Sequence, residues 1–254
     1  MDRLDSSAIV VQGLEVRVVE SCTSTNALLL QERIAAQPVL LAAEEQTAGR
    51  GRRGRRWLSA RGAGVTFSLA CRVSRPAREL AALSIVAGVA TAGALRTMGV
   101  HQAALKWPND LVAAGAKLGG ILVETRSQGS SAQAVIGIGI NCRCDPGLAL
   151  RLRRDVASLD QFIEVGSRNC IIARVASALL AALAAFDGRG LDAVRGEWEA
   201  MDAHAGQKLR VRLADGRVVT GVAGGLAEDG GLRLLTRRGV RAVHSGRVVR
   251  ATPA

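Results

Sequence analysis

The run TAGRGRRGRRW, residues 47–57, places five arginines and three glycines within eleven positions. Glycines at positions 49, 51 and 54 permit backbone conformations with positive φ, in which successive N–H groups can point into one concavity and hold an anion. A basic run of this kind is also typical of a solvated surface loop. This run follows a predicted buried strand and ends on Trp57, and these flanks favour a lid with an anchored hinge.

Lysine is rare in this chain, because only Lys106, Lys117 and Lys208 are lysines among 34 basic residues. A lysine offers a compact ammonium charge, whereas an arginine offers a planar fork of donors. Lys106 and Lys117 therefore mark positions at which arginine would not serve. A tight site for a phosphate or acyl oxygen is such a position.

The segment KWPND, residues 106–110, ends a predicted strand, and Pro108 imposes an extended or turning backbone there. This arrangement can gather Lys106, Asn109 and Asp110 around one point. Asparagine and aspartate after a proline are also ordinary turn residues. The segment alone leaves a binding role and a structural role equally open.

Two glycine-containing segments follow. GAKLGGILVE, residues 115–124, places Lys117 at the mouth of an apolar strand whose glycines would let a ligand approach, although Lys117 could also be a plain edge charge. IGIGINC, residues 136–142, alternates isoleucine with glycine and ends near the amide of Asn141. It is not the dinucleotide fingerprint, because no helix pattern follows it. The alternation indicates close packing, against a ligand or within the protein.

The composition limits the possible classes of protein. A chain of 254 residues that is 48% hydrophobic can bury one large core, with room for a small appended domain. The net charge of +12 suggests nucleic-acid binding, but 2% aromatic residues and no tyrosine argue against a base-stacking surface. The five cysteines lack the paired spacing of a zinc site, so we expect free thiols in a reducing cytoplasm and identify no metal ligands.

Hydrophobic periodicity predicts the elements that position these segments. We expect strands at 15–20, 39–45, 64–73, 103–107, 117–125 and 132–142, and helices from 24 to 34 and over 79–98, 167–186 and 190–202. The apolar run 80–95 is shorter than the roughly 20 residues of a membrane span, so we interpret it as a core helix. No export signal precedes it. The element order predicts an α+β fold, a mixed β-sheet with helices on one face.

From Gly206 onward the pattern changes to short alternating segments separated by glycine and aspartate. Even spacing with turn signals is typical of a small antiparallel barrel. We therefore predict two domains, 1–204 and 205–254.

Several of these segments, taken in order, resemble the biotin protein ligase family. The resemblance runs through STN (24–26), EEQTAGRGRRGRRW (44–57), KWPNDL (106–111), KLGGILVE (117–124), GIGIN (137–141) and SGRV (245–248). It covers nearly the whole chain. It implies a catalytic domain like those of class II aminoacyl-tRNA synthetases and biotin–lipoate ligases, followed by a Src-homology-3-like β-barrel.

The resemblance also implies a two-step reaction. Biotin would be activated with ATP and Mg²⁺ to biotinoyl-5′-AMP and then transferred to a lysine of a biotin carboxyl carrier protein domain. Lys117 and Arg52 would be catalytic. The biotin site would comprise Ser24, Thr25, Asn26, Gln46, Arg50, Gly51, Arg52, Lys117 and Gly119. The ATP and adenylate site would comprise Arg52, Arg53, Lys106, Trp107, Asn109, Asp110 and Asn141.

The chain departs from the family in two places. Some members carry an N-terminal helix-turn-helix repressor domain, whereas the STN motif begins here at residue 24, so we expect a ligase without repressor function. Residues 143–155, where a loop would cover the nucleotide, contain no aromatic residue to stack on adenine. We expect a cytoplasmic enzyme that binds no membrane and no specific nucleic-acid sequence. The sequence leaves the oligomeric state open, with a homodimer as one candidate. Lipoate or octanoyl transfer on the same fold, and a nucleic-acid-binding module, are the alternatives.

Overall fold

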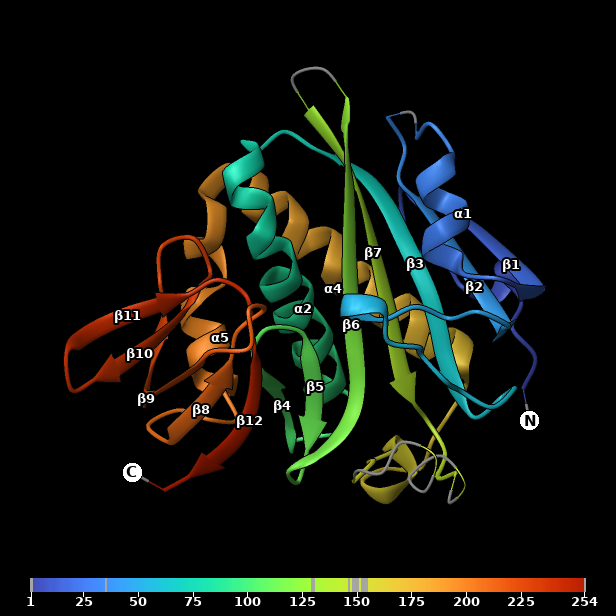
Figure 1. The fold of residues 1–254 in the computed structure, drawn as a ribbon. Helices are drawn as coiled ribbons and strands as arrows, with labels where there is room; N and C mark the ends of the chain where they lie inside the picture. The colour runs from blue at the N-terminus through green and yellow to red at the C-terminus, as the bar shows by residue number, and fades with distance from the viewer. Residues whose placement is uncertain are drawn as a thin grey trace.

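A mixed sheet of seven strands forms the centre of the molecule (Figure 1). The computed structural model describes residues 2–34, 36–128, 131–145, 147, 151 and 155–253. In sheet order the strands are β1 (Glu15–Cys22), β2 (Val39–Gln46), β3 (Gly64–Val73), β7 (Ser131–Asn141), β6 (Ala116–Gln128), β5 (Asp110–Ala113) and β4 (Ala103–Lys106). β1 and β2 are parallel, and the other neighbouring pairs are antiparallel. The predicted α+β class with a mixed sheet is confirmed.

Helices cover both faces of this sheet. The helices are α1 (Thr25–Gln31), α2 (Leu83–Thr97), α4 (Arg168–Arg189) and α5 (Arg195–Met201). Side chains alternate across β2, so Leu40 and Ala42 join the main core with α2 and α4, while Val39 and Leu41 pack with Leu29 of α1. The prediction placed the helices on one face. β2 is apolar at five consecutive positions, and such a strand needs cover on both sides.

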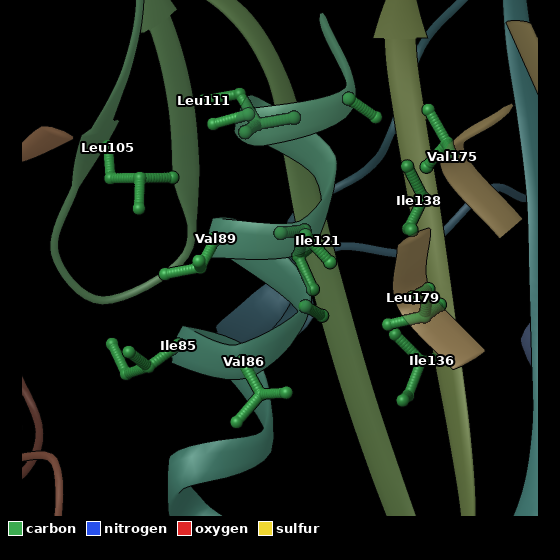
Figure 2. Packing of buried hydrophobic residues seen from close by; sticks show 14 of the residues in the cluster. Ile85, Val86, Val89, Leu105, Leu111, Ile121, Ile136, Ile138, Val175 and Leu179 are labelled. Atoms are coloured by element: carbon green, nitrogen blue, oxygen red, sulfur yellow. The ribbon is translucent and has the colours of Figure 1, made fainter. Parts of the chain in front are cut away.

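The main core fills the space between the sheet and the two long helices. In Figure 2, Ile85 and Val89 of α2 lie on the side of the helix toward Leu105 of β4, and Ile121 of β6 lies on its other side. Val175 and Leu179 of α4 lie against β7. By length and composition alone, Ala77–Thr97 and Arg168–Ala193 could each cross a membrane. In the structure the apolar faces of α2 and α4 lie in this core, in agreement with the predicted core helix at 80–95.

The C-terminal part of the chain forms a second, antiparallel sheet. Its strands are β8 (Lys208–Arg212), β9 (Val218–Leu226), β10 (Leu232–Thr236), β11 (Gly239–Val243) and β12 (Arg247–Thr252), in the order β11-β10-β9-β8-β12. Its inward residues, such as Leu209 and Val211, belong to the same buried cluster as the main core. The indole N–H of Trp107 donates to the Gly230 carbonyl across 3.1 Å. These contacts place the second sheet against the β4–β5 turn.

Some elements differ from the prediction. Residues 77–82 form a 3₁₀ helix, and α2 begins only at Leu83. The separate strand β5 was not predicted, because four residues after a proline turn are too few to show an alternating pattern. β5 pairs with β6 and so holds the KWPND turn against the sheet.

A buried ionic cluster ties the N-terminal segment to β2 and α4. The Arg168 guanidinium donates to Glu44 Oε2 across 2.8 Å and to Asp2 Oδ1 across 3.2 Å, and the Leu4 amide donates to Glu44 Oε1 across 2.7 Å. The side chains of Arg168 and Glu44 are only 4% and 5% exposed. Burial opposes ionisation of Glu44 and Asp2, but their hydrogen bonds outweigh it, and the pKa of each carboxyl lies below its ordinary value.

Replacement of Arg168 by Met should destabilise the protein by about 3–5 kcal/mol at pH 7, because it leaves the Glu44 carboxylate buried without its partner. The lowered pKa values also predict a pH dependence. The cluster stabilises the fold fully above the unfolded pKa values near 4 to 4.5, and this stabilisation is lost as the pH falls through the folded values. Urea unfolding at pH 7 and pH 4 should show a smaller acid dependence in the variant.

Arg78 provides the control for this experiment. Its side chain is 80% exposed and pairs with Glu79, so Arg78→Met should cost less than about 1 kcal/mol. An Arg168→Met protein as stable as Arg78→Met would show that the cluster contributes nothing.

Candidate active site

A cavity of about 500 Å³ opens on the face of the sheet that carries α1. Its walls come from the start of α1, the loop 50–57, strands β3, β6 and β7, the β4–β5 turn and the start of β12. In Figure 1 the short helical turn Arg52–Gly54 lies in front of β6. Segments far apart in the sequence therefore meet around one space, whose size suits a small organic ligand.

One end of the cavity is a network of uncharged polar groups. Ser24 caps α1, and Gln46 Oε1 accepts from the Thr25 amide across 2.8 Å. The Thr25 hydroxyl lies 2.6 Å from the hydroxyl of Ser68, which donates to Asn26 Oδ1 across 2.6 Å. Thr25, Asn26 and Ser68 are buried. Such groups can hydrogen-bond a neutral polar ring without an ionic partner.

The isoleucine–glycine alternation of β7 has a direct structural reason. Ile136, Ile138 and Ile140 point into the main core, whereas Gly137 and Gly139 line the cavity. A Cβ atom on Gly137 would lie 2.2 Å from Asn26 Oδ1, and one on Gly139 would lie 2.4 Å from the Trp57 ring. The predicted close packing is therefore found, and it is packing against the protein's own cavity wall.

The arginine run folds as a short loop anchored at both ends. Arg50 and Arg56 form an antiparallel bridge, the Gly51 amide donates to the Arg55 carbonyl across 2.7 Å, and the Trp57 indole donates to Thr66 Oγ1 across 3.3 Å. The expected positive φ occurs at Gly54 and at Arg53, but not at Gly49 or Gly51. Glycine is needed at 49 for space, because a Cβ atom there would lie 2.6 Å from the Trp57 carbonyl oxygen.

All five arginines of this loop line the cavity, and two of them make contacts with other segments. Arg50 pairs with Glu124 of β6 across 3.1 Å, and Arg53 donates to Ser245 Oγ across 2.9 Å. Glu124 also accepts from Asn26 Nδ2 across 3.0 Å. Burial lowers the pKa of Arg52, the neighbouring Arg53 lowers it further, and Asp110 opposes this. An anion in the cavity would relieve that repulsion.

The KWPND turn supplies the opposite wall. Lys106 and Asp110 face each other across the β4–β5 hairpin, and Lys117 forms an ion pair with Asp110. Asn109 is held to β6 by two hydrogen bonds with the backbone of Ile121, of 2.7 and 3.0 Å. Lys106, Asn109, Asp110 and Lys117 all line the cavity, and so does Trp107.

Most of the predicted site residues meet at this cavity. Its lining includes Ser24, Thr25, Asn26, Gln46, Arg50, Gly51, Arg52, Arg53, Lys106, Trp107, Asn109, Asp110 and Lys117.

Asn141 and Gly119 lie outside the lining. The Asn141 amide donates to the backbone carbonyls of Ala157 and Lys117, across 3.0 and 3.4 Å, and so holds the strand that carries Lys117. Gly119 lies on the opposite side of β6 from Gly120, because neighbouring strand residues alternate between faces.

Several residues of the site were not identified individually from the sequence. Ser68 and Glu124 stand in apolar strands, and the register of those strands brings them to the cavity network. His204 and Arg247 reach the cavity from the end of α5 and the start of β12. Burial, reinforced by Lys106, lowers the pKa of His204 to about 4, so its imidazole is neutral at pH 7. Most of the segment 143–155 lies outside the described residues.

The arrangement suits one kind of ligand and one kind of chemistry. A neutral hydrogen-bonding pocket adjoins a cationic region built from Arg50, Arg52, Arg53 and Lys117. Such a region can hold a carboxylate beside a phosphate and stabilise negative charge that develops between them. The five cysteines are free, and within the described ranges no three His, Cys, Asp or Glu side chains gather as a metal cluster.

Comparisons with known proteins agree with this geometry. A family model described as the Biotin/lipoate A/B protein ligase family matches residues 17–141, and one described as the Biotin protein ligase C terminal domain matches residues 204–250. Bifunctional ligase/repressor BirA of Escherichia coli (strain K12) is 35% identical over 233 residues, which are 88% of this chain and 70% of that protein. Biotin--[acetyl-CoA-carboxylase] ligase of Mycobacterium tuberculosis is 32% identical over 228 residues, 87% of this chain and 83% of that protein.

Solved structures extend the likeness to three dimensions. Biotin protein ligase from Aquifex aeolicus, in complex with biotin and ATP, superposes with a TM-score of 0.79 at 26% identity over 94% of this chain and 99% of that chain. A match over this share of the chain extends over both the seven-stranded sheet and the C-terminal sheet. By sequence, fold and the segments that build the cavity, the chain belongs to the biotin protein ligase family.

Proposed function

We propose that this protein joins biotin to ATP, forming biotinoyl-5′-AMP and pyrophosphate, and then transfers the biotinoyl group to a lysine of a biotin carboxyl carrier protein domain. One observation carries the proposal. A single cavity of about 500 Å³ contains an uncharged hydrogen-bonding pocket next to a cationic region. Biotinoyl-AMP has the same order of groups, a neutral ring followed by the acyl group and the phosphate. The relatives named for biotin ligation, and the neighbour solved with biotin and ATP, support the same activity.

The roles of the binding residues follow from where they lie. Ser24, Thr25, Asn26 and Gln46 would bind the ureido ring of biotin, with Ser68 holding Thr25 and Asn26 in place from behind. Arg50, Gly51, Arg52 and Arg53 would close over the carboxylate and the adenylate phosphate. Lys106, Trp107 and Asn109 would line the nucleotide side. Asn141 and Gly119 would contribute only by holding the backbone of the strands on which the site is built.

Lys117 is the proposed catalytic residue, with Arg52. In the first step a carboxylate oxygen of biotin attacks the α-phosphorus of ATP, and pyrophosphate leaves. Negative charge increases at the transferring phosphoryl group, and a fixed ammonium group stabilises it. Asp110 pairs with Lys117, and both side chains line the cavity. In the second step the acceptor amine attacks the biotinoyl carbonyl and AMP leaves.

The residues that line the cavity could hold Mg²⁺ together with the phosphates of ATP. This ion is usually held by one or two carboxylates together with substrate phosphates. Asp110 and Asp155 are the carboxylates that line the cavity in the described part of the chain. Bound with the nucleotide, Mg²⁺ would neutralise part of the phosphate charge.

The remaining expectations also stand as proposals. We propose a catalytic domain at 1–204 and a small β-domain at 205–254, supported by the separate C-terminal sheet. A cytoplasmic location, the absence of sequence-specific nucleic-acid binding and a homodimer remain predictions from the sequence and the family.

Lys117→Ala should lower biotin-dependent exchange of labelled pyrophosphate into ATP at least tenfold, since the ammonium group at the reacting centre is lost. Lys208→Ala is the matched control, because Lys208 is the exposed lysine of β8 and does not line the cavity; its exchange rate should equal that of the parent. Pyrophosphate exchange that depends on lipoate or octanoate but not on biotin would contradict the proposal that biotin is the substrate. Equal rates in both variants would remove Lys117 from the mechanism.

Ser68→Ala should raise the KM for biotin about tenfold with a smaller effect on kcat, because a buried network without its central hydroxyl costs about 1–3 kcal/mol. Thr91→Ala is the control. Thr91 is equally buried, but its hydroxyl donates to the Ala87 carbonyl within α2. The KM for biotin, measured by pyrophosphate exchange, should stay at the parent value in Thr91→Ala. A matching rise in both variants would indicate general destabilisation.

A further inference from the structure

The outer face of the C-terminal sheet carries a row of exposed cations, here named the arginine ladder. It consists of Lys208, Arg210 and Arg212 of β8 with Arg247 and Arg250 of β12. All five are exposed, and they alternate with the buried Leu209, Val211 and Val248. The ladder is therefore a regular feature of two paired strands and not a mobile tail.

The register of these strands sets like charges against each other. Arg212 is directly opposite Arg247, and Arg210 is directly opposite Arg250. Directly opposed like charges destabilise a sheet. In the turns of this domain Arg217 forms an ion pair with Asp215, and His244 lies 3.0 Å from Asp229. No ion pair in the described part of the chain includes a ladder residue. The sheet thus maintains an uncompensated repulsion on its surface.

The wider charge distribution has the same sign. Residues 205–254 contain ten lysines and arginines and three acidic residues, so this short segment holds +7 of the chain's net charge of +12. Because the surface is exposed, the field extends about one Debye length into solution, roughly 8 Å at physiological salt. A field of this kind attracts an anionic partner and raises its rate of encounter.

The ladder is continuous with the cavity. Arg247 both belongs to the ladder and lines the cavity, and Gln207, which precedes Lys208, lines it as well. The neighbouring Ser245 accepts a hydrogen bond from Arg53 of the loop over the site. A macromolecule bound along the ladder would therefore lie at the mouth through which an acceptor lysine must enter.

We propose that the arginine ladder is the docking surface for an acidic face of the protein domain that carries the acceptor lysine. This inference rests on the proposed function. Complementary charge would orient the acceptor so that its lysine amine reaches the biotinoyl carbonyl. Its main effect would be to raise the rate at which the acceptor associates with the enzyme. A single-stranded nucleic acid is a poorer fit, because residues 205–254 contain no aromatic side chain on which a base could stack.

The test compares two triple variants of equal charge change. Arg210→Gln, Arg212→Gln and Arg250→Gln together remove three ladder charges and leave Arg247, which lines the cavity, in place. Arg233→Gln, Arg237→Gln and Arg241→Gln together remove three exposed charges from β10, β11 and the turn between them. Transfer of labelled biotin from preformed biotinoyl-AMP to a recombinant biotin carboxyl carrier domain is measured between about 0.05 and 0.5 M salt, across which screening becomes strong.

The ladder variant should lose at least tenfold in the second-order rate constant at low salt, and the loss should vanish at high salt. The distant variant should lose about twofold or less, since exposed charges farther from the site are screened. Biotin-dependent pyrophosphate exchange should be unchanged in both. Capture of the biotinoyl group by hydroxylamine, whose nitrogen attacks the carbonyl as AMP leaves, should also be unchanged. The melting temperature of the ladder variant should equal or exceed that of the parent, because two like-charge pairs are removed.

Equal losses in the two variants would overturn the proposal, as would a ladder effect that persists at high salt. A duplex DNA bound more tightly than about 1 μM at physiological salt, with the same arginines required and acceptor transfer blocked, would assign the ladder to nucleic acid instead. A parent protein without biotin-dependent exchange would reject the proposed function, and this inference with it.

Discussion

The close contact between strand β7 and the cavity wall is the constraint on which the site depends. Isoleucines on one side of β7 pack against the long helices, and glycines on the other side admit Asn26 and Trp57 to the strand surface. Any larger side chain at Gly137 or Gly139 would occupy the space of those residues. The start of α1 and the anchor of the arginine loop are both positioned by this one glycine-bearing face.

Charge is distributed in the site in an order that matches a two-part ligand. The neutral network around Thr25 and Ser68 lies beside a region where arginines from one loop meet a lysine from β6. The arginines repel each other, and burial makes the repulsion costly for Arg52. Binding of an anion would offset that cost. The ion pair between Arg50 and Glu124 links this loop to Asn26 and hence to the neutral end of the cavity.

Stability and function use positive charge in different ways in this protein. Arg168 is buried and fully paired, and it fastens the N-terminal segment to the core. The ladder arginines are exposed and opposed to one another, which weakens the sheet that carries them. Arginine therefore stabilises the fold where it is buried beside carboxylates, and it creates a positive surface potential where it is exposed beside other arginines.

The sequence by itself determined the class of fold, the family and most of the residues that line the candidate cavity. Long apolar runs and alternating strands are local patterns, and the order of the motifs from STN to SGRV identified the family. It also indicated Lys117, Asp110 and the arginine run as candidate site residues, because the scarcity of lysine, the spacing of the motifs and their flanking residues are visible along the chain.

Tertiary structure decided the features that depend on strand register and on which face of a sheet a side chain occupies. Register brought Ser68 and Glu124 into the network, turned Asn141 and Gly119 away from the cavity, and set the ladder arginines opposite one another. These contacts and orientations involve residues that are far apart in the sequence, and no local sequence pattern encodes them.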